Sequence, residues 1–143
     1  HPAIPDPLWS RGLGDVYKRQ ADTDGTTVDR QGFESDMFIV NSGIEGDTLS
    51  GSVKFDFILQ ESADDSSWSA VTSSTSVTET SVDSSGIFLT LDANGETPQT
   101  SQIGYIGGKR YVRVKIDATG THSNGTPISV QAVLGNPADS EDA

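Results

Sequence analysis

Cysteine is absent from this sequence, and aromatic side chains make up only 7% of it. Without cysteine the fold can have no disulfide, no thiolate metal ligand and no cysteine nucleophile. Basic residues are also scarce: 9 Lys and Arg stand against 21 Asp and Glu, and the formal net charge is -12. Such a charge repels phosphate backbones and anionic lipids, so we expect neither a nucleic-acid nor a membrane partner. No run approaches the roughly 20 apolar residues that span a bilayer.

Short runs of alternating apolar and polar residues, separated by Gly, Asn, Asp and Ser, make up most of the chain. The clearest is 52–61, SVKFDFILQE, in which Val53, Phe55, Phe57 and Leu59 alternate with mostly polar residues. A period of two indicates a β-strand with one buried face. Similar runs predict further strands at 33–41, 68–72, 86–93, 101–106, 110–118 and 127–134. No segment has the spacing of an amphipathic helix.

Two of these runs meet at a pair of glycines, Gly107 and Gly108, within SQIGYIGGKRYVRV at 101–114. Glycine readily takes the positive φ angles that tight hairpin turns need. The pattern therefore predicts a β-hairpin formed by 101–106 and 110–118.

Short connections favour antiparallel pairing, because a parallel crossover needs about a dozen residues or more. We predict a single all-β antiparallel sandwich over 21–137, and the pattern leaves jelly-roll and immunoglobulin-like topologies open. The Ser/Thr-rich segment 72–85 fits a solvated loop or a weak edge strand, and 138–143 an acidic disordered tail. The predicted core consists of Phe33, Phe38, Val40, Val53, Phe55, Phe57, Leu59, Trp68, Ile87, Leu89, Leu91, Tyr105, Val112, Val114, Ile116, Ile128, Val130 and Val133.

The first twenty residues differ in style from the rest, being rich in proline and without periodicity. The hexapeptide DVYKRQ at 15–20 resembles a translation of the mosaic-end adapter used in transposase-based sequencing libraries. Our hypothesis is that 1–20 are a non-native, adapter-derived segment of a metagenomic reading frame, to be left out of fold analysis. The alternative is a natural disordered arm, which continuous raw reads across the Gln20–Ala21 junction would support.

Four weak motifs follow one another over 26–137: TTVDRQGFESDMFIV, LQESADDSSW, IGYIGGKRYVRVKI and VQAVLGNP. Their order and spacing resemble small virion proteins of tailed bacteriophages, which are often encoded near the major capsid gene. The resemblance implies a β-sandwich structural protein of the virion, associated with the head or decorating the capsid. It supplies no catalytic residue, and the insert at 72–85 is longer than the resemblance leads us to expect.

Candidate metal and catalytic residues each have a simpler interpretation. Asp22 and Asp24 begin a DTDG motif, but the twelfth position of a calcium loop, where a bidentate Glu belongs, is Phe33. Adjacent Asp64 and Asp65 are typical of an exposed turn. His122 lies in a THSNG segment without an evident orienting acid, which favours a surface histidine. We therefore predict no metal, no cofactor and no enzymatic activity.

A basic strip holds four of the six Lys and Arg that follow residue 20. The strip consists of Lys109, Arg110, Arg113 and Lys115. By alternation, Arg113 and Lys115 share one strand face while their apolar neighbours point inward. The functional interpretation is a docking surface for an acidic partner, and the alternative is pairing with Asp and Glu of a neighbouring strand.

The expected function is that of a non-enzymatic phage virion protein, located in the virion, which assembles on the capsid or head surface and stabilises it. Its expected partner is the major capsid protein or another virion protein, and a homo-oligomer is left open. The alternative is a carbohydrate-binding β-sandwich module. In that case Trp68, Tyr105 and Tyr111 would stack on sugar rings, which requires that these rings be exposed together.

Overall fold

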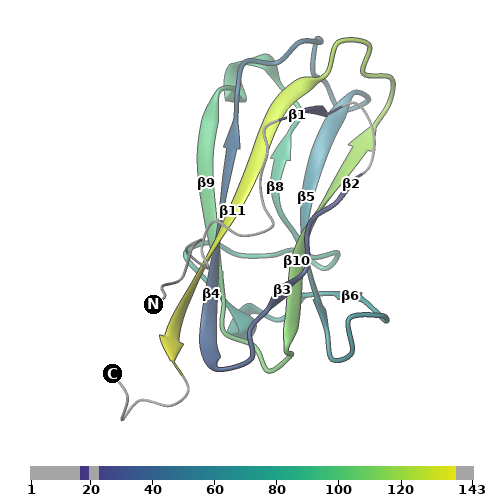
Figure 1. Ribbon diagram of the computed structural model, residues 1–143. Helices are drawn as coiled ribbons and strands as arrows, with labels where there is room; N and C mark the ends of the chain where they lie inside the picture. Colours follow the sequence, from purple (N-terminus) through teal and green to yellow (C-terminus); the bar gives the residue numbers. More distant parts are fainter. Residues whose placement is uncertain (1–16, 20–22, 138–143) are drawn as a thin grey trace.

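Eleven strands of the described residues, 17–19 and 23–137 of the computed structural model, form two antiparallel sheets that pack face to face (Figure 1). The first sheet has the order β1-β11-β4-β9-β7 and the second β2-β10-β5-β6, with β3 beside β10 and β8 beside β5. The predicted all-β sandwich is thus confirmed. In this part of the chain no helix is long and apolar enough to cross a membrane.

The first sheet contains β1 (Tyr17–Arg19), β4 (Phe33–Ser42), β7 (Val77–Thr78), β9 (Gln99–Tyr105) and β11 (Thr126–Pro137). The second contains β2 (Thr23–Asp24), β3 (Val28–Asp29), β5 (Lys54–Ser62), β6 (Ser69–Ala70), β8 (Ile87–Leu91) and β10 (Tyr111–Thr119). Two short 3-10 helices, η2 (Ser74–Ser76) and η3 (Asn94–Glu96), lie in the connections. The Ser/Thr-rich segment forms η2, the two-residue edge strand β7 and loops.

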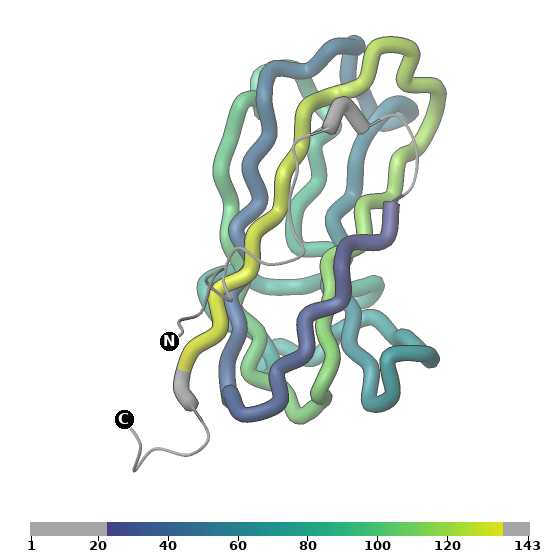
Figure 2. Tube along the Cα trace, viewed as in Figure 1, coloured from purple at the N-terminus to yellow at the C-terminus, as the bar shows by residue number. Residues whose placement is uncertain are grey.

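The chain crosses between the sheets at every connection from β6 to β11, as the trace shows (Figure 2). The strands pair in a nested order: β1 with β11, β2 and β3 with β10, β4 with β9, and β5 with β8. Nested antiparallel pairs are the arrangement of a jelly roll. Of the two topologies that the sequence leaves open, the strand order favours this one.

Part of the N-terminal segment that we ascribe to the adapter contributes to the first sheet. Tyr17–Arg19 pairs antiparallel with residues 126–128 of β11. Residues 1–16, residue 20 and the acidic tail 138–143 lie outside the described residues. Backbone pairing is independent of where a segment comes from, and the adapter hypothesis stays a prediction that raw reads test.

The hairpin predicted across Gly107 and Gly108 is wrong. β9 pairs with β4 and β7 of the first sheet, whereas β10 pairs with β2, β3 and β5 of the second. The two glycines lie in a connection between the sheets, and neither has a positive φ angle. Gly107 is needed for another reason: a Cβ there would come within 2.6–2.8 Å of the end of the Tyr105 ring.

Gly107→Ala is therefore expected to lower the free energy of unfolding by about 1–3 kcal/mol, because the added methyl group displaces the buried Tyr105 ring. A Cβ on Gly108 meets nothing within 4 Å, so Gly108→Ala is the matched control and should change stability by less than about 0.5 kcal/mol. Urea denaturation of the two variants measures the difference. Equal stability of both would contradict the close approach at Gly107.

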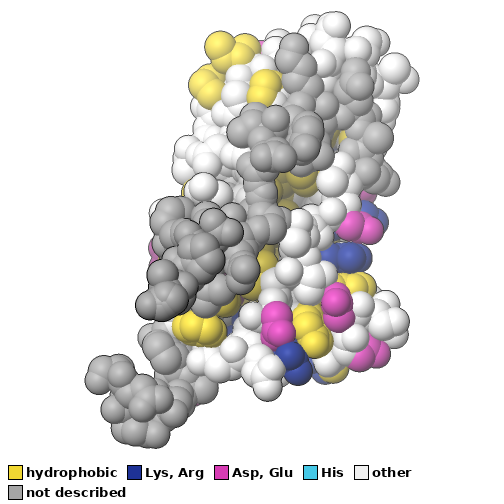
Figure 3. All heavy atoms as spheres, in the orientation of Figure 1, with side chains coloured by type: hydrophobic (Ala, Val, Ile, Leu, Met, Phe, Trp, Pro, Cys, Tyr) yellow, Lys and Arg dark blue, Asp and Glu magenta, His cyan; other side chains and the backbone are white. Residues whose placement is uncertain are grey.

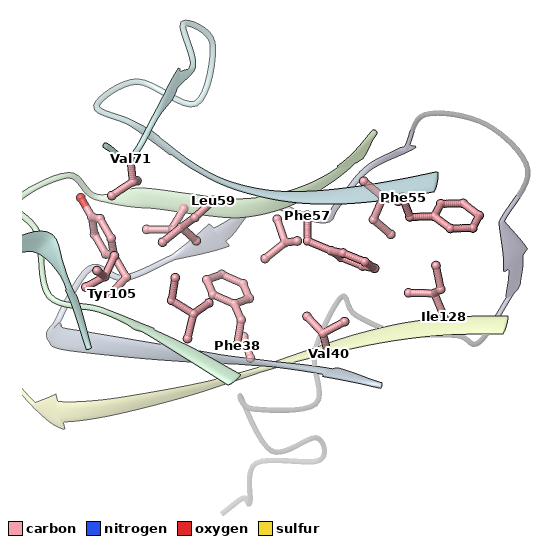
Figure 4. Close-up of a cluster of buried hydrophobic side chains, with 14 of the residues drawn as sticks. Phe38, Val40, Phe55, Phe57, Leu59, Val71, Tyr105 and Ile128 are labelled. Atoms are coloured by element: carbon pink, nitrogen blue, oxygen red, sulfur yellow. The ribbon is translucent and has the colours of Figure 1, made fainter. Parts of the chain in front are cut away.

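The core lies between the two sheets, where inward-facing side chains of both meet (Figure 4). Phe38, Val40 and Ile128 of the first sheet face Phe55, Phe57 and Leu59 of the second. The alternation predicted for 52–61 is confirmed, since Phe55, Phe57 and Leu59 are fully buried. The other predicted core residues that are buried are Leu91, Tyr105, Val112, Val114 and Ile116.

Seven predicted core residues are not fully buried. Phe33, Val53, Trp68, Ile87, Leu89 and Val130 are half-buried, and Val133 is 38% exposed. Even-numbered residues of β11 point inward, so the odd-numbered Val133 faces out from the first sheet. The core also contains residues outside the predicted core list, most of them in short strands and loops: Val28, Leu49, Val71, Val77, Ile103 and Ala132.

Candidate docking surface

The predicted basic strip lies at the start of β10 and in the loop before it. Along β10 Val112 and Val114 are buried, so Tyr111, Arg113 and Lys115 face outward from the second sheet, as the alternation predicted. Lys109 and Arg110 belong to the loop that joins β9 to β10. Basic and acidic side chains lie next to each other over this part of the molecule (Figure 3).

Arg113 is held by three neighbours on the outer face of the second sheet. Its guanidinium carbon lies 4.2 Å from the centre of the Trp68 ring, a cation–π contact. Its Nε donates to the Gln60 side-chain oxygen at 2.7 Å, and its Nη2 lies 3.7 Å from an Asp24 oxygen. Gln60 stands opposite Arg113 in the β5–β10 register, and Asp24 lies on β2, the strand at the other edge of β10.

Arg110 makes a two-pronged ion pair with Asp29 of β3. Its Nε and Nη2 donate to the two carboxylate oxygens, each at 2.8 Å. The same guanidinium lies 5.0 Å from the centre of the Tyr111 ring. The hydrogen bonds from Arg110 hold the pKa of Asp29 below its ordinary value. Asp29 reaches this position because β3 pairs with the first residues of β10.

Trp68, Arg110, Tyr111 and Arg113 thus form one patch, which we call the Arg–aromatic surface. The pairing with neighbouring acids, the alternative to docking, is observed for both arginines. Lys109 and Lys115 form no ion pair with any described residue. Intramolecular pairing also fixes the two guanidinium groups in place, so it does not conflict with docking, which stays a prediction.

The three rings of the carbohydrate-binding alternative do not form one exposed platform. Tyr105 is 0% exposed and belongs to the core. Trp68 and Tyr111 are half-buried, and each has an arginine over its ring. An open groove of about 350 Å³ lies beside β8, and its lining contains no Trp or Tyr: Thr80, Ser81, Val82, Asp83, Ile87, Phe88, Leu89 and Thr90.

Beneath the Arg–aromatic surface, Tyr105 and Arg30 anchor the loop between β9 and β10. The Tyr105 hydroxyl donates to Glu61 at 2.6 Å and accepts the Lys109 N–H at 3.1 Å. Burial, followed by the hydrogen bond to Glu61, raises the pKa of Tyr105 to about 12. Arg30 lies 4.7 Å over the Tyr105 ring and donates to the carbonyls of Lys109 and Gly107 at 2.9 and 2.6 Å.

Asp36 of β4 is a buried acid beside this anchor, and it stands opposite Tyr105 in the β4–β9 register. Asp36 is only 2% exposed, and neither carboxylate oxygen accepts a hydrogen bond of normal geometry from a described residue. Burial raises its pKa to about 7, against the opposing effects of Arg30 and of the nearby Met37 N–H. Sequence analysis missed Asp36, although alternation places it on the same face as Phe38 and Val40.

His122 is buried at 4% exposure, so the predicted surface histidine is wrong. Its ring lies 4.3 Å from that of Phe55, between centres, and its Nε2 donates to the Thr119 carbonyl at 2.9 Å. Asp47, across the adjoining loop, accepts the backbone N–H groups of Asn124 and Gly125. The short, polar loop around His122 gave no sequence signal that this side chain would be buried.

The described residues contain no group of three or more His, Asp or Glu that could hold a metal ion. Asp22 lies outside them, and Asp24 contacts Arg113. In the turn after β5, Asp64 accepts the N–H groups of Ser66 and Ser67, each at 2.9 Å, and these bonds lower its pKa. Asp64 therefore has an ordinary turn-forming role.

No protein-family model and no curated protein matches the chain. The Arg–aromatic surface offers planar cations and aromatic rings on a sheet face, and residues of these types are enriched at the energetic centres of protein interfaces.

Proposed function

We propose that this chain is a non-enzymatic structural protein of a tailed-phage virion that docks on the major capsid protein or another head protein. The resemblance of 26–137 to small virion proteins supports this, as does a nested strand order of the kind found in jelly-roll capsid domains. The docking element is the Arg–aromatic surface on the outer face of the second sheet.

The observation that carries the proposal is the clustering of Trp68, Arg110, Tyr111 and Arg113. Trp, Tyr and Arg are the residues most enriched in the energetic centres of protein interfaces. Asp24 and Asp29 hold the guanidinium groups in place before a partner arrives. Side chains that are already ordered lose less conformational entropy on binding, which favours affinity.

The high negative charge of the chain fits the same role. A net charge of -12 keeps free subunits apart and soluble. Lys109 and Lys115, which form no ion pair with a described residue, supply positive charge beside the Arg–aromatic surface, so an acidic partner surface would meet it in a defined orientation. Binding at many equivalent sites then stabilises the shell, because a ligand that binds only the assembled state shifts the equilibrium toward it.

Arg113→Glu is expected to weaken docking at least tenfold, since it removes the stack on Trp68 and sets a carboxylate near Asp24. The melting temperature should change little, because Arg113 lies outside the core. Co-expression with the capsid and head proteins of the same genome segment, followed by pull-down, measures the loss.

Two controls show which face binds. Lys54→Glu makes the same charge change on β5, away from the Arg–aromatic surface, and should keep binding. Val133→Glu adds a charge to the outer face of the first sheet and should also keep it. Full binding by Arg113→Glu, or a loss confined to Val133→Glu, would overturn docking through the second sheet.

Location in the virion is tested separately by mass spectrometry of purified phage particles from the source community. Trypsin cleaves after Arg30 and Lys54 and releases a peptide of residues 31–54 that identifies the chain. We expect this peptide in the particle fraction together with capsid peptides. Its presence only in the cellular fraction would contradict the virion assignment.

A further inference from the structure

The loop between β9 and β10 bears Lys109 and Arg110 and leads directly into the Arg–aromatic surface. Arg30 holds this loop in place through three hydrogen bonds. The Arg30 side chain donates to the Lys109 and Gly107 carbonyls, and its backbone N–H donates to the Arg110 carbonyl at 2.8 Å. The position of the Arg30 guanidinium therefore determines how firmly this loop is held.

Arg30 and Asp36 are both buried and both incompletely bonded. Arg30 is 6% exposed, and its Nη1 has no hydrogen-bond partner among the described residues. Asp36 is 2% exposed, and neither of its carboxylate oxygens has a hydrogen-bond partner among the described residues. The two residues are linked through Tyr105: Arg30 lies over its ring, and Asp36 stands opposite it across the β4–β9 pair. Arg30 is close enough to act electrostatically on Asp36 but forms no ion pair with it.

We propose that ionisation of Asp36 is a switch that releases the β9–β10 loop from Arg30. With Asp36 neutral, Arg30 remains on the Gly107 and Lys109 carbonyls and the loop is held. Once Asp36 loses its proton, a buried and unpaired carboxylate is costly. The guanidinium group can relieve that cost by turning its free Nη1 toward Asp36, and in doing so it gives up the two carbonyls.

The surroundings of Asp36 leave few other groups to do this. From β9 it faces Tyr105, whose pKa of about 12 keeps the hydroxyl protonated at neutral pH. From β11 it stands opposite the uncharged Leu134. Glu61 of β5 is bonded to the Tyr105 hydroxyl. Lys109 lies in the loop itself and is exposed. The pKa of about 7 for Asp36 puts the transition near neutrality.

The switch is a regulatory feature of the proposed docking surface, and only its biological meaning rests on the proposed function. At mildly acidic pH the loop, and with it Arg110 and Tyr111, is held in the arrangement described above. At mildly alkaline pH the loop loses its two bonds to the Arg30 side chain, and docking should weaken without any change in the second sheet itself.

Nuclear magnetic resonance of the free, full chain between pH 5.5 and 8.5 tests the switch. We expect the amide signals of Gly107, Gly108 and Lys109 to shift together with a midpoint near pH 7. The carboxyl carbon of Asp36 should titrate with the same midpoint. In Asp36→Asn the three amide signals should stay at their acidic-limit positions throughout.

His122→Gln is the matched control, because it replaces another buried polar side chain that lies outside the β9–β10 loop. It should leave the titration of the loop unchanged. Loop amides that do not move in the wild type, that still move in Asp36→Asn, or that no longer move in His122→Gln would overturn the switch. If Asp36→Asn does not fold, unequal midpoints of the Asp36 carbon and the loop amides in the wild type would do the same. No partner is present, so failure here leaves the docking result of Arg113→Glu untouched.

Discussion

Phe57→Ala is expected to lower the free energy of unfolding by about 3–5 kcal/mol, the usual range for removing a buried aromatic ring. Phe57 is fully buried at the centre of β5, with β10 on one side and β8 on the other. Its ring lies 6.3 Å from that of Phe88, between centres, and it points into the layer between the sheets (Figure 4). The substitution leaves a cavity between the sheets. Two packed sheets cannot close it well, because neither sheet can move inward without breaking its own strand pairing.

Urea denaturation at constant pH measures this loss. Val133→Ala is the control: it removes apolar atoms from a side chain that is 38% exposed on the outer face, and should change stability by less than about 0.5 kcal/mol. A loss below about 1 kcal/mol for Phe57→Ala would mean that Phe57 is not at the centre of the core.

Asp36→Asn is expected to become more stable relative to the wild type as pH rises. In the folded chain the pKa of Asp36 is about 7, against an ordinary value of 3.8, so the folded state binds the proton more tightly than the unfolded state. The contribution of Asp36 to stability is therefore complete below pH 3.8, declines as pH rises toward 7, and is constant above that. Asparagine does not ionise and lacks this decline.

The size of the effect follows from the gap between the two pKa values. About three units, at about 1.4 kcal/mol each, set an upper limit of about 4 kcal/mol between pH 4 and pH 8. Urea denaturation of both proteins at several pH values gives the difference directly. Glu34→Gln, which replaces an exposed acid on the same strand, is the matched control. A difference between Asp36→Asn and the wild type that is constant with pH would contradict the assignment.

The local pattern predicted the strands well, because a half-buried strand needs alternation wherever it lies. β4, β5, β9, β10 and β11 lie close to their predicted positions. Strands without that pattern were harder to predict from the sequence. β2, β3 and β7 have two residues each, and they are strands only because β9 or β10 offers them backbone groups to pair with.

The connection at Gly107 shows the limit of local signals. A glycine pair between two alternating runs is typical of a hairpin, but the same residues also suit a crossing between sheets. Whether the chain forms a hairpin or crosses to the other sheet depends on which strand edges are free to pair. β9 pairs with β4 and β10 with β5, and these partners lie more than 40 positions away in the sequence. No short stretch of sequence around Gly107 contains that information.

The candidate site was predicted in part. Charge and alternation placed Arg113 and Lys115 on one outward face, which is confirmed. The partners of the arginines were not predictable: Trp68, Gln60, Asp24 and Asp29 come from four other strands or their ends. Asp36 carried a usable signal, an acid at an inward position of an alternating strand.

The sequence by itself determined the strand content, the inward faces of the long strands, the high negative charge and the position of the basic strip. These follow from composition and from a period of two, which are local properties. The tertiary structure alone decided the nested strand order, the burial of His122, and the meeting of Arg30 with Tyr105 beside Asp36. These depend on long-range pairing, in which distant segments compete for the same sheet edges and the same space in the core.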